Sequence, residues 1–515
     1  MKRETLPIAV SMVLVFVICI LISFMTGCTS SAQKKVAYWN SQIGIAKYDD
    51  VVRSLGPPTA KDTLSDGSIV AKWVRKSYAT WGGSGSWTEE VLMRFSPGGI
   101  LTQSITTRNA ASCSQAAVQA AVDAAADGDI VQIPACVTTA WSTYVTVNNK
   151  AITIRGAGIG NTILSAAGDG SYSFYVPDTN TKMVKFYDMT LTVAGNQSCV
   201  SAPFYSCGNI KIDGGINGSP TFVVGRISFD HRPANSRGGF SARGVEITNG
   251  LAGLIHHWEC HDVYACVFVF GTNDTAWAAP TGLGDANSVY IEDGSCNTSQ
   301  YSYGACTESG SGGSYVFRYN TTSGNGTGQH GPCESGGRGH RRTEIYHNTF
   351  NAATGRAYDA SALAGGTGVS FNNRYIGFSE PFHFFYKRAC EQAECAAPYN
   401  KPCDGTRAID GNQHPSGWRC RDALGTGKNQ ASEPFYSWNN CDQTVAQYPL
   451  CSDTALCDCG GASHVVNLVP ASPRGCMSKL MTLIAENRDY YNQTIKPGYV
   501  PFTYPHPLQG AMSDY

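Results

Sequence analysis

Val289-Tyr-Ile-Glu-Asp-Gly294, Tyr315-Val-Phe-Arg-Tyr-Asn320 and Thr343-Glu-Ile-Tyr-His-Asn348 superpose without a gap when their last residues are aligned. In each segment, apolar or small residues alternate with polar or aromatic ones. This is the period-two pattern of a half-buried strand, and a turn-forming residue ends it. Two upstream segments, Val245-Glu-Ile-Thr-Asn-Gly250 and Cys266-Val-Phe-Val-Phe-Gly271, fit the same template. The five segments predict repeats of one structural unit.

The spacing of the repeats favours a solenoid over a β-sandwich. Strands of a sandwich come about every 8 to 12 residues, whereas wider spacing leaves room for other short strands in each coil. The intervals between equivalent central positions are 21, 23, 26 and 28 residues, taken from Ile247, Phe268, Ile291, Phe317 and Ile345. The sequence therefore predicts a mainly β chain folded as a parallel β-helix.

Asn320 and Asn348 occupy the same turn position in their repeats. Asparagine tolerates the left-handed backbone conformation, and its side-chain amide can hydrogen-bond to the next coil. Because the position recurs, we expect stacked turns. The alternative is that each asparagine serves only its own turn.

The N-terminus has the pattern of an export signal or a membrane anchor. Lys2 and Arg3 precede an apolar run that ends in Phe24-Met25-Thr26-Gly27-Cys28. This ending resembles the lipobox of bacterial lipoproteins. The resemblance implies a signal peptide over residues 1–27, acylation of Cys28, and attachment of an exported protein to the outer membrane or cell surface through its lipid. An uncleaved transmembrane helix is the alternative.

Residues 28–35 are expected to be a polar tether, and residues 36–105 a separate small α+β domain. Helical spacing over 43–55 ends at Gly56-Pro57-Pro58, and three strand-like runs follow at 69–76, 89–95 and 100–105. The stretch from Gly44 to Pro58, with these strands, resembles the SmpA/OmlA family, small outer-membrane lipoproteins of the β-barrel assembly machinery. That resemblance implies an envelope location and suggests no catalysis.

Residues 106–515 are expected to form the β-helix, with a Cys-rich excursion at about 380–480. An Ala-rich helix over 114–126 should cover its open end, whose exposed strand edge would otherwise recruit other chains. Asp127 to Pro134, followed by Ala151-Ile-Thr-Ile-Arg-Gly-Ala-Gly158, resembles the opening of pectate-lyase-like β-helix proteins. This resemblance implies a right-handed parallel β-helix. Segments 417–422, 433–439 and 496–507 resemble a group of exported bacterial β-helix proteins.

Charge and cysteine content narrow the class of protein. A net charge of −1 argues against a nucleic-acid partner, which would require a basic stripe. Of the 20 cysteines, Cys19 lies in the signal and Cys28 in the lipobox, so an even number remains, as expected for disulfides in an exported chain. Close pairs that could form disulfides are Cys199/Cys207, Cys260/Cys266, Cys296/Cys306 and Cys451/Cys457.

The aligned repeats place Glu292 beside Arg318 on the outward face, with Tyr290, Tyr346 and Glu344 around them. Sugars stack on aromatic rings and bind charged groups, and a uronate would also bind arginine. A lyase would need a base and Ca²⁺ held by carboxylates, whereas a hydrolase would need two carboxylates. Glu292, Arg318 and Glu344 are therefore the catalytic candidates, with Tyr290 and Tyr346 as ligand contacts. A surface ion pair without function is the alternative.

The Gly-rich loop over 330–342 supplies further ligand-binding candidates, namely His330, Arg338, His340 and Arg342. A turn with solvated charges would have the same composition. A cluster from His256 to Asp262 has metal-ligating residue types, although Cys260 is expected to pair with Cys266. The sequence thus predicts an envelope protein that binds polysaccharide, and it leaves open whether the protein also cleaves it. The rival is a non-catalytic surface scaffold or adhesin.

Overall fold

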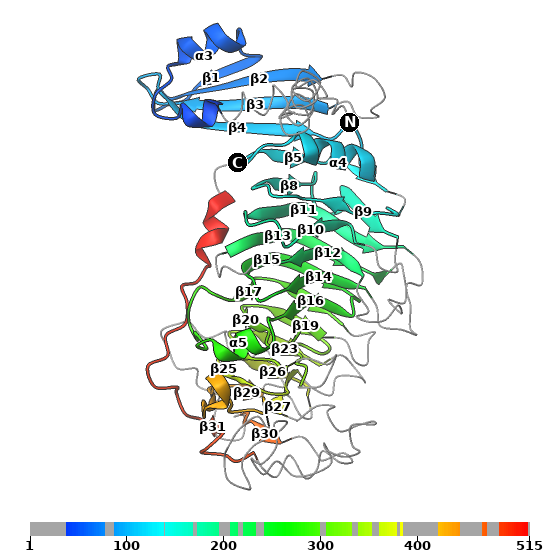
Figure 1. The fold of residues 1–515 in the computed structure, drawn as a ribbon, viewed down its shortest axis with the longest axis vertical. Coiled ribbons are helices and arrows are strands. Elements are labelled where there is room, and N and C mark those ends of the chain that lie inside the picture. Colours follow the sequence, from blue (N-terminus) through cyan, green and yellow to red (C-terminus); the bar gives the residue numbers. More distant parts are fainter. Residues whose placement is uncertain are drawn as a thin grey trace, which may run out of the picture.

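The computed structural model is mainly β, with long stacks of parallel strands that are compatible with the expected β-helix (Figure 1). It describes residues 38–77, 87–138, 140–167, 172–194, 207–214, 220–232, 242–298, 305–331, 338–352, 360–378, 382–384, 421–442, 466–470 and 484–512. The signal segment, the tether with Cys28 and most of the Cys-rich excursion lie outside these ranges. No helix in these ranges is long and apolar enough to cross a membrane.

The longest series of parallel strands, here called the main stack, runs from β5, next to the N-terminal unit, to β31 at the opposite end of the molecule. Each member pairs in parallel with the next. Its strands are β5 (Ile130–Gln132), β8 (Thr153–Arg155), β11 (Val184–Val193), β13 (Pro220–Asp230), β15 (Ala252–His261), β17 (Val289–Glu292), β20 (Ser314–Arg318), β22 (Arg342–Tyr346), β25 (Thr367–Phe371), β28 (Phe435–Trp438) and β31 (Tyr490–Asn492).

A separate sheet, here called the second stack, is also parallel throughout. Its strands are β7 (Val145–Thr146), β10 (Phe174–Val176), β12 (Gly208–Asp213), β14 (Arg243–Thr248), β16 (Ala265–Phe270) and β19 (Ala305–Gly310). Shorter strands complete the coils: β6 (Cys136–Val137), β9 (Thr162–Ala166), β18 (Ser295–Asn297), β21 (Thr321–Ser323), β23 (Thr349–Asn351), β24 (Ser361–Leu363), β26 (Arg374–Ile376), β27 (Phe382–Phe384), β29 (Cys441–Asp442) and β30 (Val469–Pro470).

The register confirms three of the five sequence repeats as equivalent and corrects the other two. Ile291, Phe317 and Ile345 pair in line on β17, β20 and β22, and all belong to the buried core. The segments at 245–250 and 266–271 lie instead on the second stack. There Val267 and Val269 belong to the core, whereas Phe268 lies outside it. The repeat alignment failed at these two segments because both stacks carry the same apolar alternation.

The predicted asparagine turns stack as a continuous ladder. The amide nitrogen of Asn320 donates to the Ile291 carbonyl at 2.9 Å, and that of Asn348 donates to the Phe317 carbonyl at 2.8 Å. Asn373 and Asn440 extend the ladder with equivalent bonds. The left-handed conformation, however, belongs to the preceding residues, such as Tyr319 (φ 56°) and His347 (φ 57°). The asparagines themselves are buried, where their amides satisfy main-chain groups of adjacent coils.

The N-terminal unit consists of α3 (Tyr48–Leu55) and the antiparallel strands β1 (Ala60–Thr63), β2 (Ile69–Ser77), β3 (Trp87–Phe95) and β4 (Leu101–Asn109). It has its own core, which includes Val51, Trp73 and Met93. β4 also pairs in parallel with β5, so the sheet continues across residues 105 and 106.

Buried charges connect this unit to the main stack. The Arg108 side chain is fully buried, and its Nε lies 2.7 Å from Asp129 while its Nη1 lies 2.9 Å from Glu89. Glu89 belongs to β3 and Asp129 immediately precedes β5. The contact therefore joins one strand of each unit.

The helix expected at 114–126 is α4 (Gln115–Ala124), and the Ser114 side chain caps it by accepting from the Ala117 amide. Val118, Ala121 and Val122 pack into the same core as the stacked strands. The edge of β5 is paired with β4, so a strand gives the edge protection that was expected from the helix. The helix instead helps to close the end of the core.

The expected disulfides Cys260–Cys266 and Cys296–Cys306 are present. A further disulfide, Cys113–Cys136, was not among the predicted close pairs. Cys207 is also disulfide-bonded. Its proposed partner Cys199, like Cys451 and Cys457, lies outside the described residues.

Candidate functional site

The three catalytic candidates meet on the main stack as the repeat alignment predicted. Glu292, Arg318 and Tyr346 are direct neighbours in register, and Glu344 pairs with Val316 two residues earlier on the same face. Arg318 Nε lies 2.6 Å from Glu292 Oε2. The aligned sequence therefore located both the strands and the ion pair.

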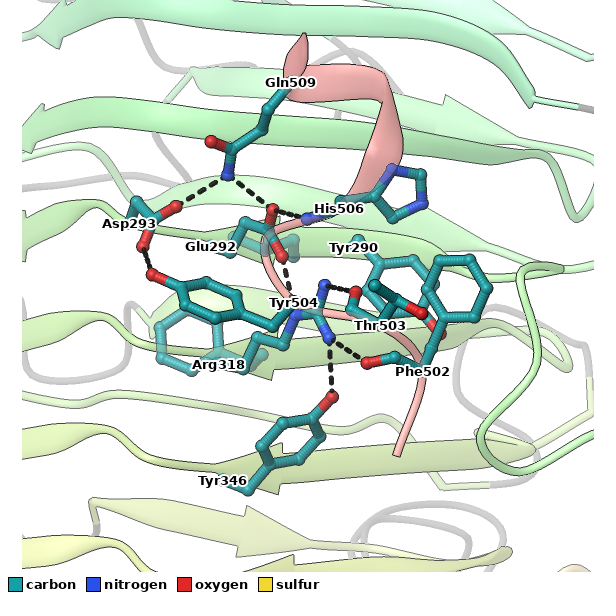
Figure 2. Close-up of polar contacts among 12 residues, drawn as sticks. Tyr290, Glu292, Asp293, Arg318, Tyr346, Phe502, Thr503, Tyr504, His506 and Gln509 are labelled. Atoms are coloured by element: carbon teal, nitrogen blue, oxygen red, sulfur yellow. Dashed lines mark hydrogen bonds and ion pairs between the residues drawn. The ribbon is translucent and has the colours of Figure 1, made fainter. Parts of the chain in front are cut away.

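The expectation of a solvent-exposed patch is wrong. Glu292, Arg318 and Glu344 are each 0% exposed, because the C-terminal segment 496–512, here called the tail, lies across them. Figure 1 shows the tail rising along the outside of the stack, and Figure 2 shows its residues over Glu292 and Arg318. These side chains point away from the interior of the coil but do not reach solvent.

Each nitrogen of the Arg318 guanidinium already donates a hydrogen bond to a group of the protein. Nη1 donates to the Phe502 carbonyl at 2.7 Å and to the Tyr346 hydroxyl at 3.0 Å, and Nη2 donates to the Thr503 carbonyl at 2.9 Å (Figure 2). The Tyr290 ring lies 4.8 Å from the guanidinium carbon. With the tail in place, Arg318 does not offer an open anion site.

The two carboxylates are likewise occupied. Glu292 Oε1 accepts from the His506 amide at 2.9 Å and from Gln509 Nε2 at 2.6 Å. Glu344 accepts from the Gly284 amide at 3.0 Å and from the Tyr499 hydroxyl at 2.6 Å. Burial raises the pKa of both Glu292 and Glu344. A carboxyl held this way could donate a proton, but the tail separates it from any substrate.

The four loop candidates do not converge on this cluster. Arg342 donates to the Thr281 carbonyl at 2.6 Å and to the Asn287 carbonyl at 2.8 Å, so it holds the loop before β17. Arg338 Nε donates to Asp422 at 2.8 Å. His340 is fully buried against Ser309, and burial lowers its pKa. His330 lies on the other stack, where it contacts Glu308.

The His256–Asp262 cluster is not assembled as a metal centre. Cys260 is in a disulfide, and His256 Nδ1 lies 3.0 Å from His257 Nδ1. Among the described residues, no group of three potential ligands is placed to hold a metal ion.

A second mixed patch, which the sequence analysis missed, lies on the outward side of the second stack. Register places Tyr175, Lys211, Glu246, Phe268 and Glu308 in one line on five successive strands. We call this patch the second-stack face. It comprises Tyr172, Tyr175, Lys211, Asp213, Arg243, Glu246, Thr248, Phe268, Phe270, Glu308 and His330.

The polar groups of the second-stack face are linked to one another. Asp213 accepts from the Tyr175 hydroxyl at 2.9 Å and from the Thr248 hydroxyl at 2.7 Å. Lys211 Nζ lies 3.5 Å from Asp213 and 4.0 Å from Glu246. These contacts fix the rotamers of charged side chains without fully burying them, since Lys211 is 25% and Asp213 18% exposed.

Aromatic rings flank the charged groups. Phe268 and Phe270 stack with centroids 4.3 Å apart, and the Arg243 guanidinium carbon lies 4.2 Å from the Phe268 ring. His330 lies 5.2 Å from Phe268, and its Nε2 lies 3.0 Å from Glu308. The Phe270 and Tyr175 rings are partly exposed. The second-stack face thus offers ring surfaces beside hydrogen-bonding groups.

The sequence signal for this face was present but was misassigned. Glu246 and Thr248 flank the inward residue Ile247 in the segment 245–250, so the alternation places them outward, but that segment was aligned with the main stack. The correct partners appear only in the register of β14 with β12 and β16.

No protein-family model matches the chain, and no curated protein matches it. A solved structure titled "Geobacillus virus E2 - ORF18" is similar to this chain with a TM-score of 0.33 and 14% sequence identity. The similarity covers 65% of each chain, so this chain spans less than two thirds of that structure. A similarity this low shows neither a shared fold nor a shared function.

Proposed function

We propose that the protein is an exported, lipid-anchored, right-handed β-helix protein that binds polysaccharide on its second-stack face. The observation that carries this proposal is the line of Tyr175, Lys211, Glu246, Phe268 and Glu308 across five strands. Its open part consists of the partly exposed rings of Tyr175 and Phe270 beside the partly exposed charges of Lys211 and Asp213, whereas Glu246, Phe268 and Glu308 are buried. Sugar rings stack on aromatic faces, and their hydroxyls require hydrogen-bonding partners. A flat row of strands suits an extended polymer.

The cell-envelope location is supported by the lipobox-like sequence ending at Cys28 and by the disulfides. Disulfides persist in oxidising compartments outside the cytosol. An SmpA/OmlA-like role for residues 36–105, and a pectate-lyase-like ancestry for the β-helix, are part of this proposal. The partners would be a polysaccharide or another envelope component and the membrane, reached through the lipid.

Cleavage is a second activity that the second-stack face could support. Glu246 and Glu308 stand two strands apart, which is about 10 Å at the usual strand spacing, near the separation of two carboxylates in an inverting hydrolase. Both are buried, at 3% and 5% exposed, and contact Arg243 and His330 respectively, so a substrate would have to displace these contacts. A lyase would in addition need a cation such as Ca²⁺. Glu292, Arg318 and Glu344 remain the sequence-derived catalytic candidates, with the tail over them.

A non-catalytic scaffold or adhesin is the second candidate function. It is favoured by one specific observation: the charged groups of the main-stack cluster are buried and bonded to the chain's own tail. A cluster occupied in this way stabilises a rigid rod and is not open to substrate.

The test is a glycan array, followed by calorimetry with any glycan that binds. Phe270→Ala should weaken binding at least about tenfold, equivalent to roughly 1.4 kcal/mol. Val137→Ala, at a residue that is 75% exposed on another face, serves as the control and should leave binding unchanged. Release of reducing ends, and ultraviolet absorbance of unsaturated products with Ca²⁺ or with chelator, would separate a hydrolase from a lyase. If the protein binds no glycan on a broad array, the polysaccharide proposal is wrong and the scaffold function is favoured.

A further inference from the structure

The main-stack face beneath the tail recognises the tail's main chain. Arg318 donates from Nη1 and Nη2 to two successive carbonyls, those of Phe502 and Thr503, at 2.7 and 2.9 Å. Glu292 accepts from the His506 amide at 2.9 Å. Arg318 and Glu292 are paired with each other, so each orients the other toward the peptide backbone.

Side-chain contacts add selectivity for particular tail residues. The Tyr499 hydroxyl donates to Glu344 at 2.6 Å, and the Tyr504 hydroxyl donates to Asp293 at 2.6 Å. The Tyr504 ring also stacks on Tyr319 with centroids 3.6 Å apart. Two hydroxyls, an aromatic stack and main-chain bonds together define a linear peptide motif.

The tail has few restraints other than this docking. The chain carries no cysteine beyond Cys476, so no disulfide holds the tail. The described part of the tail pairs with no strand, because the last strand, β31, ends at Asn492. The link into the tail is solvent-exposed, with Ile495 55% exposed, and Gly498 has a φ of 70° with open space around it.

Release of the tail would rehydrate the buried Glu292, Arg318 and Glu344, which offsets part of the contact energy that is lost. A tail from a second copy would restore every one of these contacts. The free-energy difference between a chain that binds its own tail and one that binds the tail of a second copy is then set by the linkage of the tail to its own chain and by the protein concentration. The same holds for segment exchange between identical protomers.

We infer that the outer main-stack face formed by Tyr290, Glu292, Asp293, Arg318, Tyr319 and Glu344 is a peptide-recognition surface whose partner is the tail of a second copy of this chain. The chain's own tail is the exchangeable occupant. This inference is independent of the proposed polysaccharide site, which lies on the other stack.

The experiment uses the full chain with a specific protease site placed at residues 494–496 and a dye at the C-terminus. After cleavage, a synthetic peptide of residues 496–512 is added as the probe, standing for the tail of a second copy. We expect it to displace the labelled tail, measured by fluorescence polarisation. A probe with Phe502→Ala and Tyr504→Phe should compete at least about tenfold less well. These changes are in the peptide, so they leave the fold of the body intact.

Uncut chains with two different tags are then mixed, and one tag is captured. Recovery of the second tag, reduced by Tyr504→Ala in both chains, is the expected result. The inference is overturned if no excess of the peptide displaces the cut tail, or if a scrambled peptide displaces it equally well. Absence of the second tag after capture would overturn exchange between copies.

Discussion

Replacement of Arg318 by alanine should destabilise the folded chain by about 3–5 kcal/mol, the range for breaking a buried ion pair by removing one partner. Had the residue been an exposed partner of Glu292, as the sequence suggested, the loss would be below roughly 1 kcal/mol. The larger value applies because both side chains are 0% exposed and only 2.6 Å apart. The substitution also removes the donors to the Phe502 and Thr503 carbonyls.

The measurement is chemical denaturation followed by circular dichroism, with Arg226→Ala as the matched control. Arg226 also lies on a main-stack strand and pairs with Asp188 at 2.6 Å, but its side chain is 41% exposed, so its loss should cost less than about 1 kcal/mol. The double variant Glu292→Gln with Arg318→Met should recover part of the stability, since it leaves no unpaired buried charge. Equal effects of Arg318→Ala and Arg226→Ala would refute the reasoning.

Three further outcomes are expected. Asn348→Ala should cost about 2 kcal/mol or more in the free energy of unfolding, because each buried partner left unsatisfied costs about 1–3 kcal/mol; a loss no greater than that of the exposed Asn467→Ala would contradict the ladder. Burial lowers the pKa of His231 from 6.5 to about 4, so its stabilising contribution is complete above pH 6.5 and is lost as the pH falls toward 4; His231→Gln should flatten this part of the stability–pH curve, and superposable curves would rule out the assignment. Arg108→Met should cost about 3–5 kcal/mol and speed hydrogen exchange at β4 and β5, because it removes the cation from buried Asp129 and leaves Glu89 with only Arg75, at 3.8 Å; unchanged exchange there would show that the junction does not depend on this contact.

Local patterns in the sequence were sufficient to locate individual strands. The alternation over 289–292, 314–318 and 342–346 predicted both the strands and their register, because slipping a strand by one residue would bury Arg318 inside the coil. The close cysteine pairs 260/266 and 296/306 were also correctly paired, since short separations on a rigid stack leave few alternatives.

The same local patterns could not predict which stack each strand belongs to. From β7 to β19 the chain alternates between strands of the main stack and of the second stack, and both inner faces are apolar, so alternation alone does not say which strand continues which. From alternation alone, the segment at 245–250 could be the main-stack neighbour of β17 or the second-stack neighbour of β16. Only the lengths of chain between these strands distinguish the two pairings, and the structure shows the pairing with β16. The second-stack face was missed for this reason, although the alternation around Ile247 places Glu246 and Thr248 outward.

The burial of Glu292 and Arg318 could not be predicted for another reason. It depends on contacts with the tail, such as that between Glu292 and His506, which are 214 residues apart in the sequence. Strand alternation reports whether a side chain points into the coil, and it does not report what lies against the outside. The tail itself carries the missing signal. Between Pro497 and Pro507 it has repeated prolines and aromatic residues but no period-two alternation, which argues against a strand and leaves its rings in need of a surface to cover. On the main stack, the outward residues Tyr290, Glu292 and Arg318 of β17 and β20 offer such a surface. When a solenoid's outer column combines aromatic and charged residues, a proline- and aromatic-rich terminus should therefore be tested as its first occupant, before any external ligand.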